Sequence, residues 1–201
     1  MIRLHTAHTP NGRKISIALE ELGLPYEVNA VDLATGEQLK PDFLRLNPNH
    51  KIPVLEDDGQ VVWESGAILL YLGEKYDRRG VLLPSDPRLR MAAIQYAFFQ
   101  AAGIGPNLGR LGQAFRENKP ELIPIFQAEV ARLLGVLESI LGDGREYLAG
   151  PYSIGDIMHY PWLKAALDLK LPDLMKQPRV LAWLERIGAR PAVQRGMAVP
   201  G

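Results

Sequence analysis

The sequence predicts two domains of different class, an α/β domain followed by an all-helical domain. Strand and helix patterns alternate up to residue 76, whereas no strand pattern longer than three or four residues occurs beyond residue 86. Between these regions, residues 78–87 are charged and rich in turn-forming residues, which is typical of a linker. A chain of 201 residues is long enough for two small domains. We therefore place the domains at residues 1–79 and 86–201, with a linker at 80–85.

The first domain begins with a predicted strand-helix-strand unit. A short strand is expected from Ile2, and apolar residues then repeat at the spacing of one helical face between residues 15 and 22. We expect Asn11-Gly12 to cap this helix and Gly23 to end it. Residues 26–31 predict a second strand. Because a helix joins the two strands, they should be parallel.

A β-hairpin and a helix are predicted to complete this domain. Pro53 opens a short apolar run, an Asp-Asp-Gly turn follows at residues 57–59, and residues 61–63 form the returning strand. A helix should then run from Ser65 to about residue 76. A short helical segment around Phe43 precedes the hairpin, so the order is βαβ-α-ββα. This order is the thioredoxin-like arrangement.

The second domain contains only helical patterns. These cover four stretches, at about residues 87–117, 120–141, 153–169 and 178–189. Gly103-Ile104-Gly105-Pro106 should kink the first helix, because proline removes one ladder hydrogen bond. Ser153 and Asp156 have the spacing of a capping box. We interpret Asp156 as structural, and its replacement by Ala should cost about 1 kcal/mol or more.

Composition limits the classes of function. Lys plus Arg is 23 and Asp plus Glu is 23, which argues against nucleic acid or an anionic membrane as the main partner. No run of 18 apolar residues and no signal-like start occur, so we expect a cytoplasmic protein. The chain has no Cys, so any thiol chemistry must use a thiol brought by a ligand. His5 and His8 lack further ligands at a matching spacing, and we expect no metal.

Two pairs of residues in the hairpin region predict a ligand site. A proline such as Pro53 at the start of a strand often marks a turn or a cis peptide. Glu64 and Ser65 lie where the free N–H groups and positive end of a helix favour an anionic group. Together they describe a cradle for a peptide-like ligand with an amine and a carboxylate. The alternative is an ordinary connection between a hairpin and a helix.

This stretch resembles the glutathione site of the glutathione transferase family, and the resemblance covers essentially the whole chain. It implies a cis Pro53, main-chain bonds from Ile52 to the cysteinyl part of glutathione, and a γ-glutamyl end held by Glu64 and Ser65. His50 and Lys51 would then lie near the glycyl carboxylate, with Lys51 either its ion-pair partner or an ordinary solvated lysine. The resemblance also implies glutathione as co-substrate and pairing of two subunits as a homodimer. A helical-domain arginine often joins the glycyl carboxylate in this family, and the sequence does not rank Arg110, Arg116 and Arg132.

The loop after the first strand narrows the resemblance. Many family members activate the thiol with Tyr, Ser or Cys, and residues 5–14 contain none of these. Thr9-Pro10-Asn11-Gly12 instead resembles the bacterial nu class, often described as glutathione-dependent disulfide-bond oxidoreductases. The resemblance implies that Thr9 and Asn11 approach the sulfur as catalytic residues, with Asn11 and Gln38 also in the glutathione site. The alternative for Asn11 is a simple helix cap.

The resemblance thus implies an enzyme that uses the thiol of bound glutathione. Disulfide reduction is the expected reaction, together with peroxidase or weak conjugating activity. One alternative is a non-catalytic glutathione-fold module that binds partners or regulates, and the intact cradle argues against it. Another is an isomerase or dehalogenase that uses the same thiolate, and no residue selects between this and the first interpretation.

Overall fold

The computed structural model describes residues 1–201 and groups them into two compact units. One unit comprises residues 1–83 together with 189–201, and the other comprises residues 84–188. The chain boundary near residue 84 lies within the linker that the composition indicates. The end of the chain differs from expectation, because residues 189–201 group with the first unit and not with the helices before them.

The first unit contains a four-stranded mixed sheet with the strand order β2-β1-β3-β4. The strands are β1 (Ile2–Thr6), β2 (Tyr26–Ala30), β3 (Val54–Asp57) and β4 (Gln60–Trp63). β1 and β2 are parallel, as a helical crossover requires, and the other two pairs are antiparallel. The thioredoxin-like order predicted from the sequence is therefore confirmed.

Helices α1 (Pro10–Leu22) and α3 (Ser65–Tyr76) pack against one another and contribute to the core of this unit. Between β2 and β3 lie the short 3-10 helix η1 (Glu37–Leu39) and α2 (Pro41–Leu46). Apolar residues of the sheet and of these two helices are fully buried, among them Leu4, Leu55, Ile15, Leu19, Ile68 and Leu72. Burial of this apolar surface fixes the sheet edge from which the site is built.

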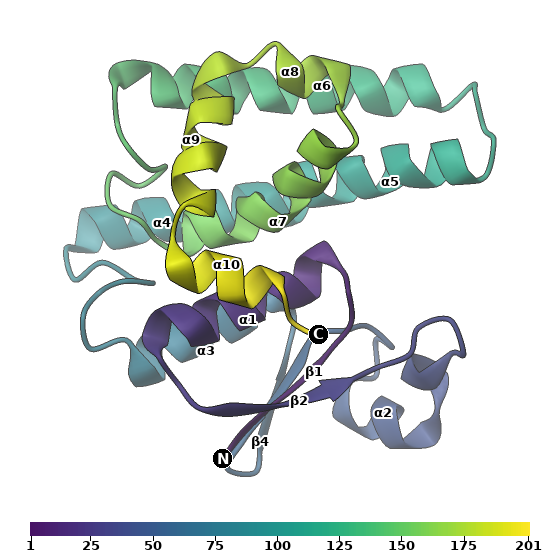
Figure 1. Ribbon diagram of the computed structural model, residues 1–201, viewed down its shortest axis with the longest axis vertical. Helices are drawn as coiled ribbons and strands as arrows, with labels where there is room; N and C mark the ends of the chain where they lie inside the picture. The colour runs from purple at the N-terminus through teal and green to yellow at the C-terminus, as the bar shows by residue number, and fades with distance from the viewer. The chain divides into compact units, whose positions relative to one another are not determined.

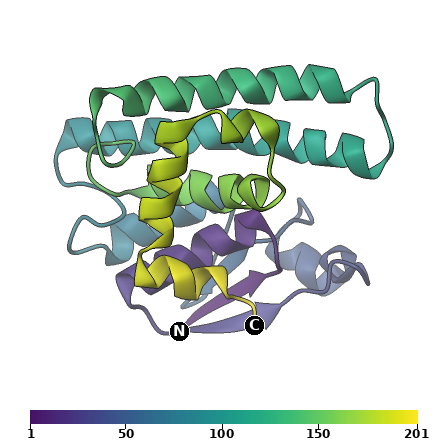
Figure 2. The ribbon, with the colours of Figure 1, turned by 45° about the horizontal axis from the view of Figure 1, so that its top comes forward.

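The last helix, α10 (Pro191–Met197), lies alongside α1, and both ribbon views show the two helices side by side (Figures 1 and 2). A Cβ added at Gly196 would lie 2.5 Å from the backbone of Ile17, so only glycine permits this approach. Ser16 Oγ donates a 2.6 Å hydrogen bond to the Gly196 carbonyl, and Arg190 forms two bonds to Glu21. These long-range contacts explain why the end of the chain joins the first unit.

The second unit is all-helical, as predicted. Its helices are α4 (Pro87–Phe99), α5 (Gly105–Arg116), α6 (Ile123–Ile140), α7 (Ile154–Asp168), α8 (Pro172–Met175) and α9 (Pro178–Gly188), with η3 (Leu141–Asp143) after α6. α5 and α6 pack side by side (Figure 2). A π-helical turn, η2 (Gln100–Ile104), joins α4 to α5 where a kink was expected. Pro106 lies in the first turn of α5, directly after this π-helical turn.

The capping box at the start of α7 is present. Ser153 Oγ accepts from the Gly155 N–H at 3.2 Å, and the Asp156 carboxylate accepts from the Ser153 N–H at 2.9 Å. Asp156 also accepts from the Leu148 N–H at 3.0 Å and from Trp183 Nε1 at 2.9 Å. Asp156 therefore links the helix start to two other segments, which makes it more than a local cap.

Two further properties bear on the expected partners. None of the helices combines the length and hydropathy needed to span a bilayer. No three His, Asp or Glu side chains are grouped so that they could hold a metal ion. His5 instead bonds to Glu56 Oε1 at 2.6 Å and to Asn29 at 2.9 Å.

Candidate functional site

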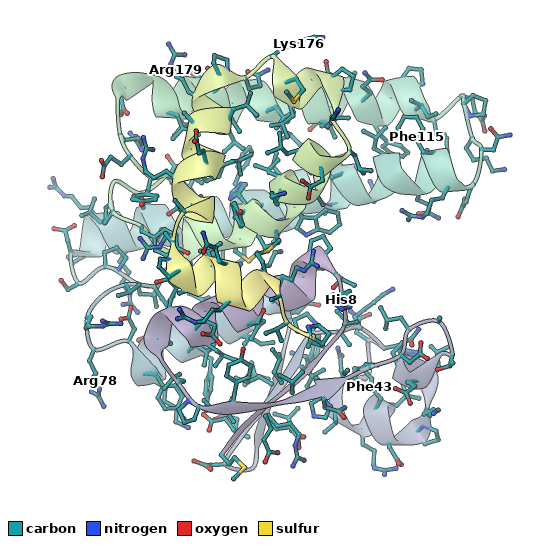
Figure 3. The ribbon with its side chains drawn as sticks, viewed as in Figure 1. His8, Phe43, Arg78, Phe115, Lys176 and Arg179 are labelled. Atoms are coloured by element: carbon teal, nitrogen blue, oxygen red, sulfur yellow. The ribbon has the colours of Figure 1, made fainter.

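The sheet register brings the predicted site segments to one edge. His5 lies opposite Val54, and Val54 lies opposite Trp63. Because β3 runs antiparallel to both neighbours, the segments after β1 and β4 leave the sheet where the segment before β3 enters it. The loop at residues 7–12, Ile52-Pro53 and Glu64-Ser65 therefore meet at this edge. Figure 3 shows His8 on the loop that follows β1.

The Ile52-Pro53 peptide is cis, as the resemblance implied. The segment before it is held by Asn47, whose Nδ2 donates to the Lys51 carbonyl at 2.7 Å. Asn47 Oδ1 also accepts from the Asn49 N–H at 2.9 Å, and the side chain is only 1% exposed. Ile52 packs on a small apolar cluster that contains Phe43, the α2 side chain labelled in Figure 3. The main chain of Ile52 is thus fixed from both sides.

The acid-serine pair begins α3 in an unusual conformation. Glu64 is the N-cap residue with φ 71°, and no side chain caps the helix. A non-glycine residue in this region costs roughly 1–3 kcal/mol and is found mainly at functional sites. Glu64 is exposed, whereas Ser65 is buried. The first N–H groups of α3 therefore face a position suited to an acceptor such as a carboxylate.

Lys14 contacts this corner from α1 and was not among the candidate residues. Its side chain is 2% exposed, and its Nζ donates to Ser65 Oγ at 3.4 Å. Burial lowers the pKa of Lys14 to about 7, while the negative charge of Glu64 acts to raise it. The sequence offered one signal, because Lys14 lies one turn before the buried Ala18 and so shares its helix face.

The loop after β1 begins α1 differently from the prediction. Thr9 is the N-cap, and its Oγ1 accepts from the Gly12 N–H at 3.2 Å. The expected cap at Asn11 is therefore corrected, since Asn11 lies within the first helical turn. A Cβ at Gly12 would lie 2.2 Å from Thr6 Oγ1, so glycine is required where the loop folds over the strand end.

The two remaining candidates lie on the flanks of this edge. Gln38 is in η1, which follows β2, and its Oε1 is buried without a hydrogen-bond partner. Lys51 is exposed, and its carbonyl is the one that Asn47 holds. No contact in the structure joins Gln38 or Lys51 to the Glu64-Ser65 corner. Their inclusion in one site depends on a ligand long enough to reach all three.

A thioredoxin-like unit with a cis-proline cradle, followed in the chain by an all-helical unit, defines the class of glutathione-transferase folds. Residues 8–75 match the N-terminal domain of glutathione S-transferases, and residues 88–191 match the C-terminal domain. The chain belongs to the glutathione S-transferase family. The family expected from the cradle residues is therefore confirmed.

Known relatives cover almost the whole chain. The disulfide-bond oxidoreductase YfcG of Escherichia coli strain K12 is 41% identical over 209 residues, spanning 98% of this chain and 94% of YfcG. A family member from Pseudomonas fluorescens, solved with two glutathione molecules bound, is 40% identical with a TM-score of 0.92 over 99% of this chain and 93% of its own. A glutathione transferase from Pseudomonas putida, solved with one glutathione disulfide per subunit, is 40% identical with a TM-score of 0.89 over 100% of this chain and 92% of its own.

Proposed function

We propose that the protein is a cytoplasmic, glutathione-dependent enzyme that reduces disulfides. The main support for this proposal is the geometry at one edge of the sheet. There, a fixed main-chain segment at Ile52 meets the N-terminus of α3, which no side chain caps. The names of similar proteins support the same reaction, since one is called a disulfide-bond oxidoreductase and another was solved with glutathione disulfide.

In this proposal glutathione is held along its length. The main chain of Ile52, next to Pro53, bonds the cysteinyl part of the ligand. Ser65 and the first N–H groups of α3 bind the γ-glutamyl carboxylate, and Glu64 pairs with the amine. Lys51 pairs with the glycyl carboxylate. The buried Oε1 of Gln38 accepts a hydrogen bond from a donor on the ligand.

The thiol of bound glutathione must become a thiolate, because a free thiol has a pKa of about 8.5. Thr9 Oγ1 accepts from the Gly12 N–H, which leaves its hydroxyl hydrogen to donate to sulfur. Asn11 and the N-terminal N–H groups of α1 supply further donors. Neutral donors suit disulfide exchange, in which a good leaving thiolate assists the reaction.

The reaction is balanced by two glutathione molecules. The first thiolate attacks one sulfur of the substrate disulfide, the sulfur–sulfur bond breaks, and the leaving thiolate takes a proton. The second glutathione attacks the mixed disulfide in the same way and releases the second thiol. Glutathione disulfide is the oxidised product, and the chain, which has no Cys, contributes no redox sulfur.

We also infer that two copies of the chain pair as a homodimer. Trp63 on the edge strand β4 is 39% exposed, and on α4, near the partly buried Ile94, Met91 and Phe98 are more than 60% exposed. Covering such apolar side chains with a partner chain removes them from water, which favours association. Light scattering should give a dimer mass at micromolar concentration, and a monomer mass would contradict the pairing.

An activity panel with glutathione tests the proposed reaction. Purified protein is assayed with 2-hydroxyethyl disulfide, cumene hydroperoxide and chlorodinitrobenzene, with heat-denatured protein as the control. We expect clear disulfide reduction and weak conjugation of chlorodinitrobenzene. Glutathione binding without turnover of any of the three would favour a non-catalytic module, and fast conjugation without disulfide reduction would contradict the mechanism.

A further inference from the structure

Lys14, a buried lysine of α1, has no role in the function proposed above. We propose that Lys14 is a positioning residue for a carboxylate at Ser65, and that it takes up a proton when that carboxylate binds. The proposal depends on the proposed function for the identity of the ligand, whose γ-glutamyl carboxylate would occupy this corner.

The hydrogen bond between Lys14 and Ser65 has a fixed direction. Lys14 Nζ donates to Ser65 Oγ at 3.4 Å, so the serine oxygen acts as acceptor on its buried side. The hydroxyl hydrogen of Ser65 is then directed away from Lys14, toward a ligand at the start of α3. Lys14 thus fixes the direction in which Ser65 donates, without contacting the ligand itself.

The charges around Lys14 affect whether its amine is protonated. Glu64 is the charged residue that acts on it, by raising its pKa. Lys75 on α3 is bound to Asp57, and His5 on β1 is bound to Glu56. Three other pairs of charged side chains on the neighbouring elements form hydrogen-bonded ion pairs: Arg3 with Glu27, Arg190 with Glu21, and Arg195 with Glu20.

A bound ligand should change the charge state of Lys14. With a pKa of about 7, Lys14 is only partly charged in the empty site at neutral pH. A carboxylate bound by Ser65 adds a negative charge on the side to which Lys14 donates, which favours the charged form of lysine. The ligand amine pairs with the more exposed Glu64 and acts in the opposite direction. Only the Ser65 hydroxyl separates the carboxylate from the ammonium, so we expect the effect of the carboxylate to be the larger.

Calorimetry with S-methylglutathione tests the proposal, because this ligand has no thiol that could release a proton. Titrations at pH 8 in buffers of different ionisation enthalpy give the number of protons taken up on binding. The wild-type protein should take up a fraction of a proton. Lys14→Arg, which is charged at this pH, should bind with similar affinity and without that uptake. Lys14→Met should bind about tenfold more weakly, also without uptake.

A substitution at a different lysine serves as the matched control. Lys176→Met removes an exposed lysine of the other unit and should keep the wild-type uptake and affinity. Equal proton uptake in the wild type and Lys14→Arg would overturn the role of Lys14 while leaving the proposed function intact. Absence of any binding to the wild type would overturn both. If Lys14→Met does not fold, the comparison of wild type with Lys14→Arg still decides the question.

Discussion

The N-termini of α3 and α7 differ in whether a side chain caps their free N–H groups. Each helix begins with N–H groups that have no partner within the helix. At α7, Ser153 and Asp156 satisfy these groups through a reciprocal capping box. At α3, the N-cap Glu64 adopts φ 71° and no side chain caps the helix. The first terminus is capped by the protein's own side chains, and the second is where the proposed ligand carboxylate would bind.

A buried ionisable side chain lies at each of these termini. Burial raises the pKa of Asp156 to about 6 and lowers that of Lys14 to about 7, so it favours the neutral form in both cases. Asp156 is surrounded by donors from Leu148, Ser153 and Trp183, which act against the effect of burial. At Lys14 the opposing charge comes from Glu64, next to the ligand position. This difference agrees with the proposal that Lys14 serves ligand binding, whereas Asp156 serves folding.

The largest expected effect is on the closed terminus. Asp156→Ala leaves the Trp183 N–H and two backbone N–H groups buried without their acceptor, and should lower the free energy of unfolding by about 3–5 kcal/mol. This exceeds the loss of a simple cap expected from the sequence. Urea unfolding measures the change, with Ser65→Ala as control at less than about 1 kcal/mol. Similar losses in the two variants would remove the distinction between the termini.

Substitutions at the open terminus should affect binding more than folding. Glu64→Ala or Ser65→Ala should weaken glutathione binding by about 1.5–3 kcal/mol, the scale of hydrogen bonds to charged groups. Calorimetry provides the measurement, and Val61→Ala on β4 is a control that leaves the corner intact. Unchanged affinity in both variants would show that the acid-serine pair is not part of the site.

The buried lysine should make stability depend on pH in the unliganded protein. Its pKa is about 7 in the folded state and 10.5 in the unfolded state, so the unfolded chain binds more protons between these values. The free energy of unfolding should therefore rise with pH, by about 2 kcal/mol between pH 7 and pH 9 from this residue. Lys14→Met should remove this increment in urea unfolding. A constant difference between variant and wild type at pH 7 and pH 9 would contradict the lowered pKa.

The smallest expected effects are at the start of α1, where Thr9 caps the helix and Asn11 is a proposed catalytic residue. Asn11→Ala should lower the rate of disulfide reduction about tenfold, which corresponds to about 1.4 kcal/mol in the transition state. Because Thr9 caps the helix, Thr9→Ala should also destabilise the fold by about 1 kcal/mol. Steady-state kinetics and urea unfolding of both variants give the two quantities. Full turnover by Asn11→Ala with glutathione bound would assign thiol activation to the backbone.

The sequence by itself determined the order of the elements and the place of the cradle. Periodicity of apolar residues gave the helices, and the turn at residues 57–59 gave the hairpin, because these signals depend on residues close in the chain. The capping box at Ser153 and Asp156 was readable for the same reason. Pro53 and Ser65 could be predicted as cradle residues because each has a local meaning at the start of a strand or a helix.

Only the tertiary structure decided which distant residues act together. Lys14 meets Ser65 across 51 positions, and Ser16 meets Gly196 across 180, so neither contact leaves a pattern in the local sequence. Glycine is likewise required at residue 12 because of the close approach of Thr6 and Ala7, which the local sequence does not show. Packing brings such groups together and removes them from water. This removal from water lowers the pKa of Lys14, so the lysine at the proposed binding corner is only partly charged at neutral pH.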